Sequence, residues 1–237
     1  MLHLGSVALD GTPRVVIAVR DGVPRDSVEA AIAAGADIVE LRIDQFSSVA
    51  EEDVLRHLAR YAGIPKLATI RAAWEGGAWH GSERERAALF RAVLPHVDAV
   101  DIELSSGEIR EEVVESAHTA GKLVLGSYHH FEAVPSVEAL EAIVADAAGT
   151  GVDLLKVAAY CGTRDELRRL AAFTLSQAGR GVVTVGMGPA GQVSRVFFPA
   201  LGSLLTYTFL GAPTAPGQLN WEDTLEYLKA FYPGCDG

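Results

Sequence analysis

The sequence predicts an α/β fold, a single (β/α)8 TIM barrel, from three observations. Short β-branched apolar runs alternate with longer segments rich in Ala, Leu, Glu and Arg along the whole chain. The apolar runs are nearly continuous, which is typical of parallel strands buried on both faces and covered by helices. Eight such strand–helix units fit into the 237 residues, with about 30 residues for each unit, as in a compact barrel.

The elements follow one another in strict alternation. The expected strands are residues 14–19, 37–43, 66–70, 97–103, 122–127, 152–157, 181–185 and 204–209. The helices expected after them are residues 23–34, 49–61, 82–94, 108–120, 137–148, 164–178, 192–201 and 222–231. Gly35 and Gly121 follow two of these helices, as helix C-termini favour. Ser82 and Glu85 form a capping-box pattern at the start of a third helix.

A doubly wound open sheet is the competing fold. It would need a phosphate-binding glycine loop after the first strand, and residues 20–24, Arg-Asp-Gly-Val-Pro, do not form one. No linker-like stretch rich in Pro, Gly and Ser divides the chain. We therefore expect residues 1–237 to form a single catalytic barrel domain.

The composition narrows the possible partners and the compartment. Twenty Lys and Arg against 31 Asp and Glu give a net charge of -11, so a nucleic-acid partner is not expected, and an anionic ligand would need local arginines. Cys161 and Cys235 are too few for a disulfide framework or a metal cluster and suit a reducing compartment. The sequence shows no signal peptide or membrane-spanning run. We therefore expect a cytoplasmic protein with no membrane partner.

Polar residues gather where the expected strands end, which is where barrel enzymes carry their functional groups. In chain order they are Glu40, Arg42, Asp44, Arg71, Glu75, Asp101, Glu103, His129, His130, Lys156, Arg195 and Gln218. This pattern predicts a functional site at the C-terminal mouth of the barrel.

Lys156 is the strongest candidate for a nucleophile. The only other lysines are Lys66 and Lys122 at strand starts and Lys229 on the last helix, where surface roles are expected. An ammonium group on an apolar strand costs on the order of several kcal/mol unless it is paired or neutral. Burial favours the free amine, which can attack a carbonyl and form a Schiff base. Taken alone, Lys156 fits a snorkelling or ion-paired lysine equally well.

A Schiff-base enzyme also needs a group that moves protons, and histidine titrates in the suitable range. His129 and His130 follow the fifth expected strand, and side-chain alternation implies that only one of them points inward. A metal site formed by His129 with Glu40, Asp44 and Asp101 is the alternative. No His-x-His or clustered His/Cys spacing supports it, so no bound metal is expected.

Three arginines, Arg42, Arg71 and Arg195, are expected at the same mouth. Guanidinium groups bind carboxylates and phosphates in bidentate fashion, so these arginines could clamp an anionic ligand. Salt bridges to the neighbouring carboxylates are the alternative, and both roles are compatible. Residues 211–218, Gly-Ala-Pro-Thr-Ala-Pro-Gly-Gln, have the turn chemistry of a mobile lid near this mouth.

Together these residues resemble those of the type I 3-dehydroquinate dehydratases, Schiff-base enzymes of the shikimate pathway. The matching segments are Glu40-Leu-Arg-Ile-Asp44, Arg71-x-x-x-Glu75-Gly-Gly, Asp101-Ile-Glu103, Ser127-Tyr-His129, Lys156, Met187-Gly to Ser194-Arg195 and Ala215-Pro-Gly-Gln218. They span most of the chain in the family's order and spacing. Each segment alone is weakly specific, whereas the whole set is strongly specific.

The resemblance implies a lyase that dehydrates 3-dehydroquinate to 3-dehydroshikimate by syn elimination of water. Lys156 would form an imine with the C3 ketone, His129 would remove a C2 proton and then protonate the departing C1 hydroxyl, and Glu75 would orient His129. The substrate-binding residues that it implies are Glu40, Arg42, Arg71, Met187, Arg195, Thr214 and Gln218. No metal, nucleotide or flavin cofactor would be needed. Relatives are often dimers, so a homodimer is expected.

Two positions depart from the family's usual pattern. His130 stands where Asp is usual, and Thr214 stands where Ser is common. Neither change removes a chemical group that the mechanism needs. Two other functions remain compatible with the sequence. One is a Schiff-base aldolase, which would require a phosphate site after the seventh and eighth strands. The other is a barrel that only binds a cyclic polyol acid, but the filled lysine, histidine and arginine positions favour an enzyme.

Overall fold

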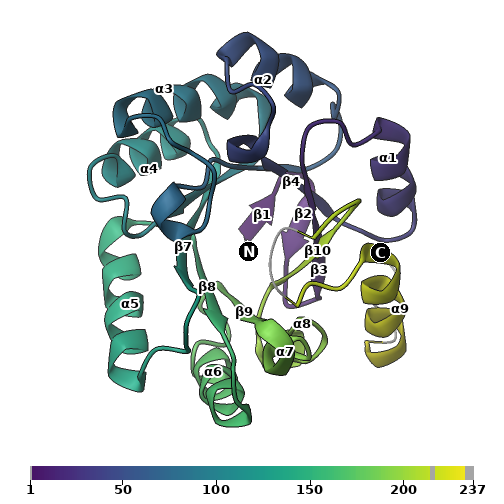
Figure 1. The fold of residues 1–237 in the computed structure, drawn as a ribbon, viewed down its shortest axis with the longest axis vertical. Helices are drawn as coiled ribbons and strands as arrows, with labels where there is room; N and C mark the ends of the chain where they lie inside the picture. The colour runs from purple at the N-terminus through teal and green to yellow at the C-terminus, as the bar shows by residue number, and fades with distance from the viewer. Residues whose placement is uncertain (1, 214–216, 233–237) are drawn as a thin grey trace.

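Eight parallel strands form a nearly closed barrel with helices around it in the computed structural model, which describes residues 2–213 and 217–232 (Figure 1). The strands are β3 (Arg14–Val19), β4 (Ile38–Arg42), β5 (Lys66–Thr69), β6 (Ala99–Glu103), β7 (Leu123–His130), β8 (Leu154–Tyr160), β9 (Val182–Met187) and β10 (Leu205–Phe209). Each strand from β3 to β8 pairs with the next in the chain, and β10 pairs with β3. Between β9 and β10, the Leu204 N–H donates to the Val182 carbonyl at 3.0 Å. The predicted (β/α)8 barrel is confirmed.

The helices form the outer layer of the barrel (Figure 1). They are α1 (Arg25–Ala33), α2 (Glu51–Ala59), α3 (Glu83–Val93), α4 (Arg110–Thr119), α5 (Val137–Thr150), α6 (Arg164–Ser176), α7 (Gly188–Gly191), α8 (Ser194–Phe197) and α9 (Trp221–Phe231). The predicted capping box is present at the start of α3. Ser82 Oγ accepts from the Glu85 N–H at 3.2 Å, and Glu85 Oε2 accepts from the Ser82 N–H at 2.8 Å.

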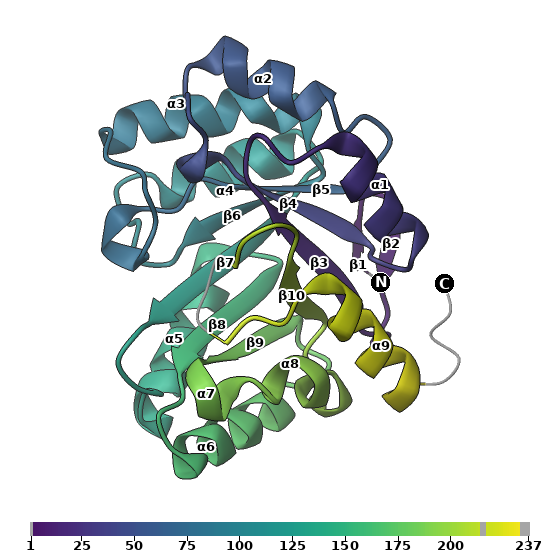
Figure 2. The same ribbon diagram turned by 45° about the vertical axis from the view of Figure 1, so that its right-hand side comes forward.

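An apolar layer fills the barrel near the starts of the strands. Each strand contributes one side chain to it: Val16, Ile38, Leu67, Ala99, Leu125, Leu154, Val183 and Leu205. A two-stranded antiparallel hairpin, β1 (Leu2–Leu4) and β2 (Val7–Leu9), packs onto this layer through Leu4 and Leu9. Figure 2 shows the hairpin at one end of the barrel. This end of the barrel is therefore closed by apolar side chains.

Sequence reasoning assigned no structure to this hairpin. Its strands are only three residues long, which is too short for a period-2 pattern to be recognised. Gly5 lies in the turn between them with φ of 59°, a left-handed conformation that glycine adopts without strain. Gly5 was the one local signal of a tight turn.

Three further expectations differ from the structure. The helix expected at 192–201 is replaced by the short α8 and a 3-10 turn, Phe198–Leu201, where Pro199 has no N–H to continue an α-helix. Strand β7 extends through His129 and His130, which pair with Ala158 and Ala159 of β8, so both histidines lie in the strand rather than after it. Lys66, expected at the surface, is buried, and its Nζ donates to two main-chain carbonyls.

None of the helices in the described part of the chain combines the length and the apolar character needed to cross a lipid bilayer.

The packing of the β1–β2 hairpin onto the apolar layer predicts that truncating Leu4, which is 1% exposed, strongly lowers stability. Leu4→Ala removes buried methyl groups and leaves a cavity, so we expect the free energy of unfolding to fall by about 3 kcal/mol. Urea denaturation measures this loss. Leu175→Ala is the matched control, because Leu175 is 61% exposed and its truncation should change stability by less than about 0.5 kcal/mol. Equal losses in the two variants would contradict the packing role of the hairpin.

Candidate active site

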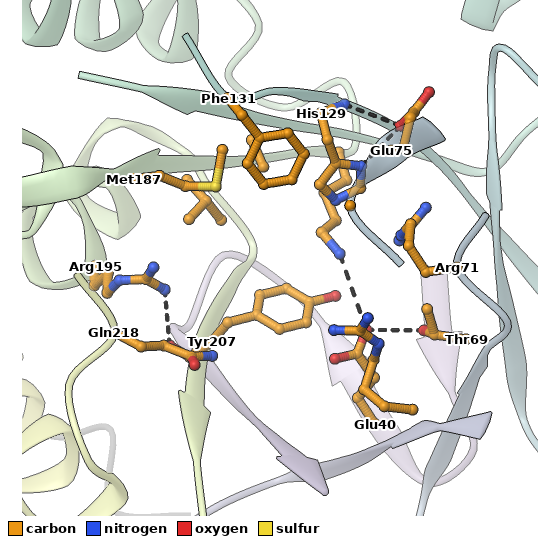
Figure 3. Close-up of a pocket in the computed structure, with 15 residues that line it drawn as sticks. Glu40, Thr69, Arg71, Glu75, His129, Phe131, Met187, Arg195, Tyr207 and Gln218 are labelled. Atoms are coloured by element: carbon orange, nitrogen blue, oxygen red, sulfur yellow. Dashed lines mark hydrogen bonds and ion pairs between the residues drawn. The ribbon is translucent and has the colours of Figure 1, made fainter. Parts of the chain in front are cut away.

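A cavity of about 590 Å³ opens at the C-terminal ends of the barrel strands (Figure 3). The candidate catalytic and substrate-binding residues within the described ranges all line this cavity: Glu40, Arg42, Arg71, Glu75, His129, Lys156, Met187, Arg195 and Gln218. The other polar residues expected at this mouth, Asp44, Asp101, Glu103 and His130, are not among the residues that line it. The remaining candidate, Thr214, lies outside the described residues. The sequence therefore located the cavity correctly, whereas the role of each residue stays a prediction.

Lys156 lies inside the barrel and is 6% exposed. Its Nζ lies 3.0 Å from Asp101 Oδ2 and 3.9 Å from Glu40 Oε1. The ring centroid of Tyr207 is 4.4 Å from the same Nζ, a distance at which the ring face attracts a cation. The ion-paired reading of Lys156 is therefore present in the structure, and its amino group also lines the cavity. Its role as a nucleophile stays a prediction.

Asp101 is the shared partner of two cations. Its Oδ1 accepts from Arg71 Nη2 at 2.7 Å and from Ser127 Oγ at 2.6 Å, while Oδ2 accepts from Lys156. Burial alone would raise the pKa of the Asp101 carboxyl, but the charges of Arg71 and Lys156 outweigh burial and hold the pKa well below its usual range. Asp101 therefore remains an anion that fixes the position of Lys156.

Arg71 and Arg42 are each held by carboxylates. Arg71 Nη1 donates to Glu103 Oε1 at 2.9 Å, in addition to its contact with Asp101. Arg42 donates to both oxygens of Asp44 in a bidentate pair, at 3.0 and 2.8 Å. The salt-bridge alternative from the sequence is thus present in the structure. Because both arginines also line the cavity, the pairing orients them without excluding contact with a ligand.

Arg195 and Gln218 lie across the cavity from Arg71 and Glu40 (Figure 3). Arg195 Nε donates to the Gly217 carbonyl at 2.9 Å, and Nη1 donates to the Tyr207 carbonyl at 3.1 Å. Burial lowers the pKa of Arg195 to about 10, so the guanidinium keeps its charge at neutral pH. This side of the cavity therefore holds a buried positive charge that an anionic ligand group can pair with.

His129 is anchored by Glu75. His129 Nδ1 lies 2.9 Å from Glu75 Oε2, and the His129 backbone N–H donates to the same oxygen at 3.1 Å. Ser105 Oγ donates to the other oxygen, Glu75 Oε1. Gly76 follows Glu75 with φ of 75°, and a Cβ at Gly76 would lie 2.5 Å from the Phe131 ring. Glycine is therefore needed at the bend that places Glu75.

Burial changes both members of the His129–Glu75 pair. It raises the pKa of Glu75 to about 7, although Ser105 and Arg71 act in the opposite direction. Burial, together with the positive charges of Arg71 and Lys156, lowers the pKa of His129 well below its ordinary value. Above about pH 7 the pair is thus a carboxylate and a neutral imidazole with its proton on Nδ1. Nε2 then carries a lone pair and can act as a base.

His130 does not line the cavity formed by the described residues. Its Nδ1 accepts from the Ala133 N–H at 3.2 Å. Only one of the two neighbouring histidines, His129, therefore lines the cavity, as strand alternation predicted. Within residues 2–213 and 217–232, no group of three or more His, Cys, Asp or Glu side chains is arranged to hold a metal ion.

Sequence reasoning missed Thr69, Ser105 and Tyr207. Thr69 Oγ1 donates to Glu40 Oε1 at 2.8 Å and lines the cavity beside it. Tyr207 also lines the cavity, two residues after the inward-facing Leu205, so strand alternation could have indicated it. Ser105 lies in the loop after β6, where no periodic pattern indicates its contact with Glu75.

Comparison with known proteins links this site to one family. The family model described as type I 3-dehydroquinase matches residues 20–234. A 3-dehydroquinate dehydratase of Methanococcoides burtonii is 34% identical over 233 residues, which cover 97% of this chain and 99% of the relative. A 3-dehydroquinate dehydratase of Methanothermobacter thermautotrophicus is 38% identical over 209 residues, 88% of this chain and 91% of the relative.

Solved structures give the same result. The 3-dehydroquinate dehydratase of Aquifex aeolicus superposes with a TM-score of 0.84 at 31% identity and covers 93% of this chain and 99% of that one. The type I 3-dehydroquinate dehydratase of Clostridium difficile, solved with covalently modified comenic acid, also has a TM-score of 0.84, at 26% identity. The superposition covers 94% of this chain and 93% of that one. The similarity thus extends over the whole barrel rather than over a single motif.

The contact between Glu75 and His129 predicts that the His129 ring changes its tautomer with pH. Above about pH 7, where Glu75 is ionised, we expect a neutral His129 ring with its proton on Nδ1. As Glu75 gains a proton below this pH, it donates to Nδ1, and the ring proton moves to Nε2. The ¹⁵N chemical shifts of the ring nitrogens report this exchange. In Glu75→Gln the change near pH 7 should disappear. A ring that instead gains a second proton near its ordinary pKa of 6.5 would contradict the coupling.

Proposed function

Because the chain belongs to the type I 3-dehydroquinase family, we propose that it dehydrates 3-dehydroquinate to 3-dehydroshikimate through an imine on Lys156. The chain is an enzyme of the hydro-lyase class. One observation carries the proposed mechanism: a buried lysine and a carboxylate-anchored histidine line the same cavity. The covalently modified acid in the Clostridium difficile relative supports covalent chemistry in this family.

The first step joins the substrate to Lys156. In the resting site Lys156 is paired with Asp101, so its ammonium must lose a proton before it can attack. His129, which is neutral and lines the same cavity, can accept this proton. The free amine then attacks the C3 ketone to form a carbinolamine. His129 returns the proton to the carbinolamine hydroxyl, which leaves as water, so that a protonated imine forms and His129 is neutral again. Asp101 stabilises this cation as it stabilises the ammonium.

The second step removes the C1 hydroxyl. The imine withdraws electrons from C2, so His129 Nε2 takes a C2 proton and an enamine forms. The electron pair of the enamine expels the C1 oxygen, to which His129 returns the proton, so that water leaves from the same face. Glu75 stabilises the imidazolium between these two transfers. A water molecule then hydrolyses the conjugated imine and frees Lys156, so the net change is the loss of one water.

The remaining residues would position the substrate. Arg195 and Gln218 would hold its carboxylate, with Thr214 as the third group of this set. On the opposite side Glu40, Arg42 and Arg71 would bind the ring hydroxyls. Met187, which is 2% exposed, would pack against the ring.

The same proposal includes the setting in which the enzyme acts. We propose one catalytic domain of residues 1–237, in the cytoplasm, working as a homodimer. Four exposed apolar side chains lie at and beside the last two α-helices: Val193 just before α8, Phe197 on α8, and Tyr227 and Phe231 on α9. Pairing of two copies would cover them. Sedimentation equilibrium tests the dimer, and a mass of about 25.1 kDa at micromolar concentration would contradict it.

The imine predicts that borohydride traps the substrate on the enzyme. Sodium borohydride added during turnover of 3-dehydroquinate should reduce the imine and fix substrate mass on the peptide that contains Lys156. We expect Lys156→Ala to abolish labelling and to lower kcat by at least about 1,000-fold. Lys122→Ala is the matched control, since Lys122 lies at the start of β7 and outside the cavity, and it should label normally.

The same experiment separates the alternatives. A dehydratase produces a conjugated enone, whose ultraviolet absorbance rises with non-phosphorylated 3-dehydroquinate. An aldolase would leave this substrate unchanged, and a protein that only binds would show affinity without an absorbance change. A wild-type enzyme that forms the enone but carries no label on Lys156 would overturn the imine mechanism.

A further inference from the structure

Tyr207 places a buried hydroxyl in the cavity without a hydrogen-bond partner. The residue is 5% exposed, and its hydroxyl has no partner among the residues that the structure describes. Figure 3 shows its ring extending across the cavity with the hydroxyl directed toward the side of Glu40 and Thr69. Leaving a buried hydroxyl unsatisfied destabilises a protein, so packing alone does not explain why a tyrosine stands here.

The position of Tyr207 is fixed by its backbone and by its ring. Its carbonyl accepts from Arg195 Nη1 at 3.1 Å, and its ring belongs to the apolar cluster inside the barrel. Phenylalanine would make the same ring contacts and avoid the unsatisfied hydroxyl. The hydroxyl is therefore the part of this side chain that needs a functional explanation, and the open cavity beside it provides space for a partner.

The charges around the phenol make it a hydrogen-bond donor. Burial, with the negative charges of Glu40 and Asp101, raises the pKa of Tyr207 well above its ordinary value, although the positive charge of Arg71 acts in the opposite direction. The phenol is thus protonated at neutral pH and can donate a hydrogen bond. Glu40 Oε1 already accepts from Thr69, and the arginines nearby offer only donors, so an incoming hydroxyl or carbonyl oxygen is the acceptor that fits.

The ring also determines which part of a ligand the hydroxyl meets. Lys156 Nζ lies over the ring at 4.4 Å from its centroid, so a carbon bonded to Nζ comes close to the same ring that carries the hydroxyl. In 3-dehydroquinate that carbon is C3, and its two neighbours are C2, which carries only hydrogens, and C4, which carries a hydroxyl. The C4 hydroxyl is therefore the nearest substrate oxygen beyond the imine.

We propose that Tyr207 is a substrate-binding and specificity-determining residue whose hydroxyl donates a hydrogen bond to the substrate hydroxyl next to the imine carbon. Its ring face supports the positive charge on Nζ, first in the ammonium and then in the imine. This inference rests on the proposed function of the same cavity. This hydrogen bond would favour ketones that carry an adjacent hydroxyl over ketones that lack one, since a ketone without that hydroxyl would leave the phenol unsatisfied.

The test pairs Tyr207→Phe with a substrate analogue, 3-dehydroquinate without the C4 hydroxyl. With the full substrate, Tyr207→Phe should lower kcat/KM about tenfold. The melting temperature should stay the same or rise, because the variant loses only an unsatisfied hydroxyl. With the analogue, the wild type and Tyr207→Phe should have equal kcat/KM values, since the interaction is absent from both.

Tyr61→Phe is the contrasting control. Tyr61 is fully buried, and its hydroxyl donates to the Val23 carbonyl at 3.3 Å, away from the cavity. This variant should lower the melting temperature and leave kcat/KM unchanged. If Tyr207→Phe behaves in the same way as Tyr61→Phe, the hydroxyl of Tyr207 is structural and the inference is overturned. An equal loss of kcat/KM on both substrates would overturn it as well.

Borohydride trapping separates this inference from the proposed function. If both the wild type and Tyr207→Phe are labelled on Lys156, the imine mechanism holds, and the kinetic comparison alone decides the role of Tyr207. If the wild type forms no labelled adduct with 3-dehydroquinate, the proposed function fails, and the inference about the C4 hydroxyl fails with it. If the wild type is labelled but Tyr207→Phe changes kcat/KM equally on 3-dehydroquinate and on the analogue without the C4 hydroxyl, only the inference is overturned.

Discussion

Asp101 binds Arg71 and Lys156 at once, deep inside the barrel, and the arrangement of the cavity follows from this interaction. The carboxylate is 0% exposed, so both cations are needed to keep it ionised. Apolar side chains of similar size would often stabilise a fold as well as a buried ion pair does. In this protein the ion pair between Asp101 and Lys156 serves to hold the amino group of Lys156 at a defined place beside the cavity. Arg71 in turn reaches Glu103, which extends the network to the next inward residue of the same strand.

The strand register explains how residues far apart in the sequence form this network. Arg42 is in register with Thr69, and Thr69 with Asp101, across β4, β5 and β6. Further along the barrel, Ser127 is in register with Lys156 across β7 and β8. Polar residues at matching heights on neighbouring strands therefore satisfy one another within the barrel. A one-residue shift of any of these strands would turn its polar side chains away from the cavity.

The sequence predicted the barrel and the cavity because both depend on local patterns. Apolar runs mark the strands, and the polar residues at their ends mark the mouth. The environment of a single side chain was less predictable, as the lysines show. Lys66 and Lys156 are both buried, but Lys66 is satisfied by main-chain carbonyls at the end of a loop, and such contacts leave no signal in the sequence. The partner of Lys156 depends on which carboxylates face inward, which the register decides.

Tyr207 was missed for a different reason. An aromatic residue on an apolar strand is typical of a core position, and the ring of Tyr207 does pack in the core. Only the structure separates the ring from its hydroxyl, which extends into the cavity. The short hairpin of β1 and β2 was missed because three-residue strands carry too few positions for a pattern. In both cases the deciding information is where a segment lies relative to the rest of the barrel.

The two ends of the barrel have opposite effects on stability. At the mouth, the folded protein raises the pKa of Glu75 from its ordinary 4.5 to about 7, so folding favours the protonated form. Between these pH values the folded state binds more protons than the unfolded chain, and stability falls as pH rises through this range. The ionised Glu75 that anchors the base is thus a destabilising group at neutral pH. The apolar layer under Leu4 and Leu9, which contains no titratable side chain, stabilises the fold independently of pH and offsets this effect.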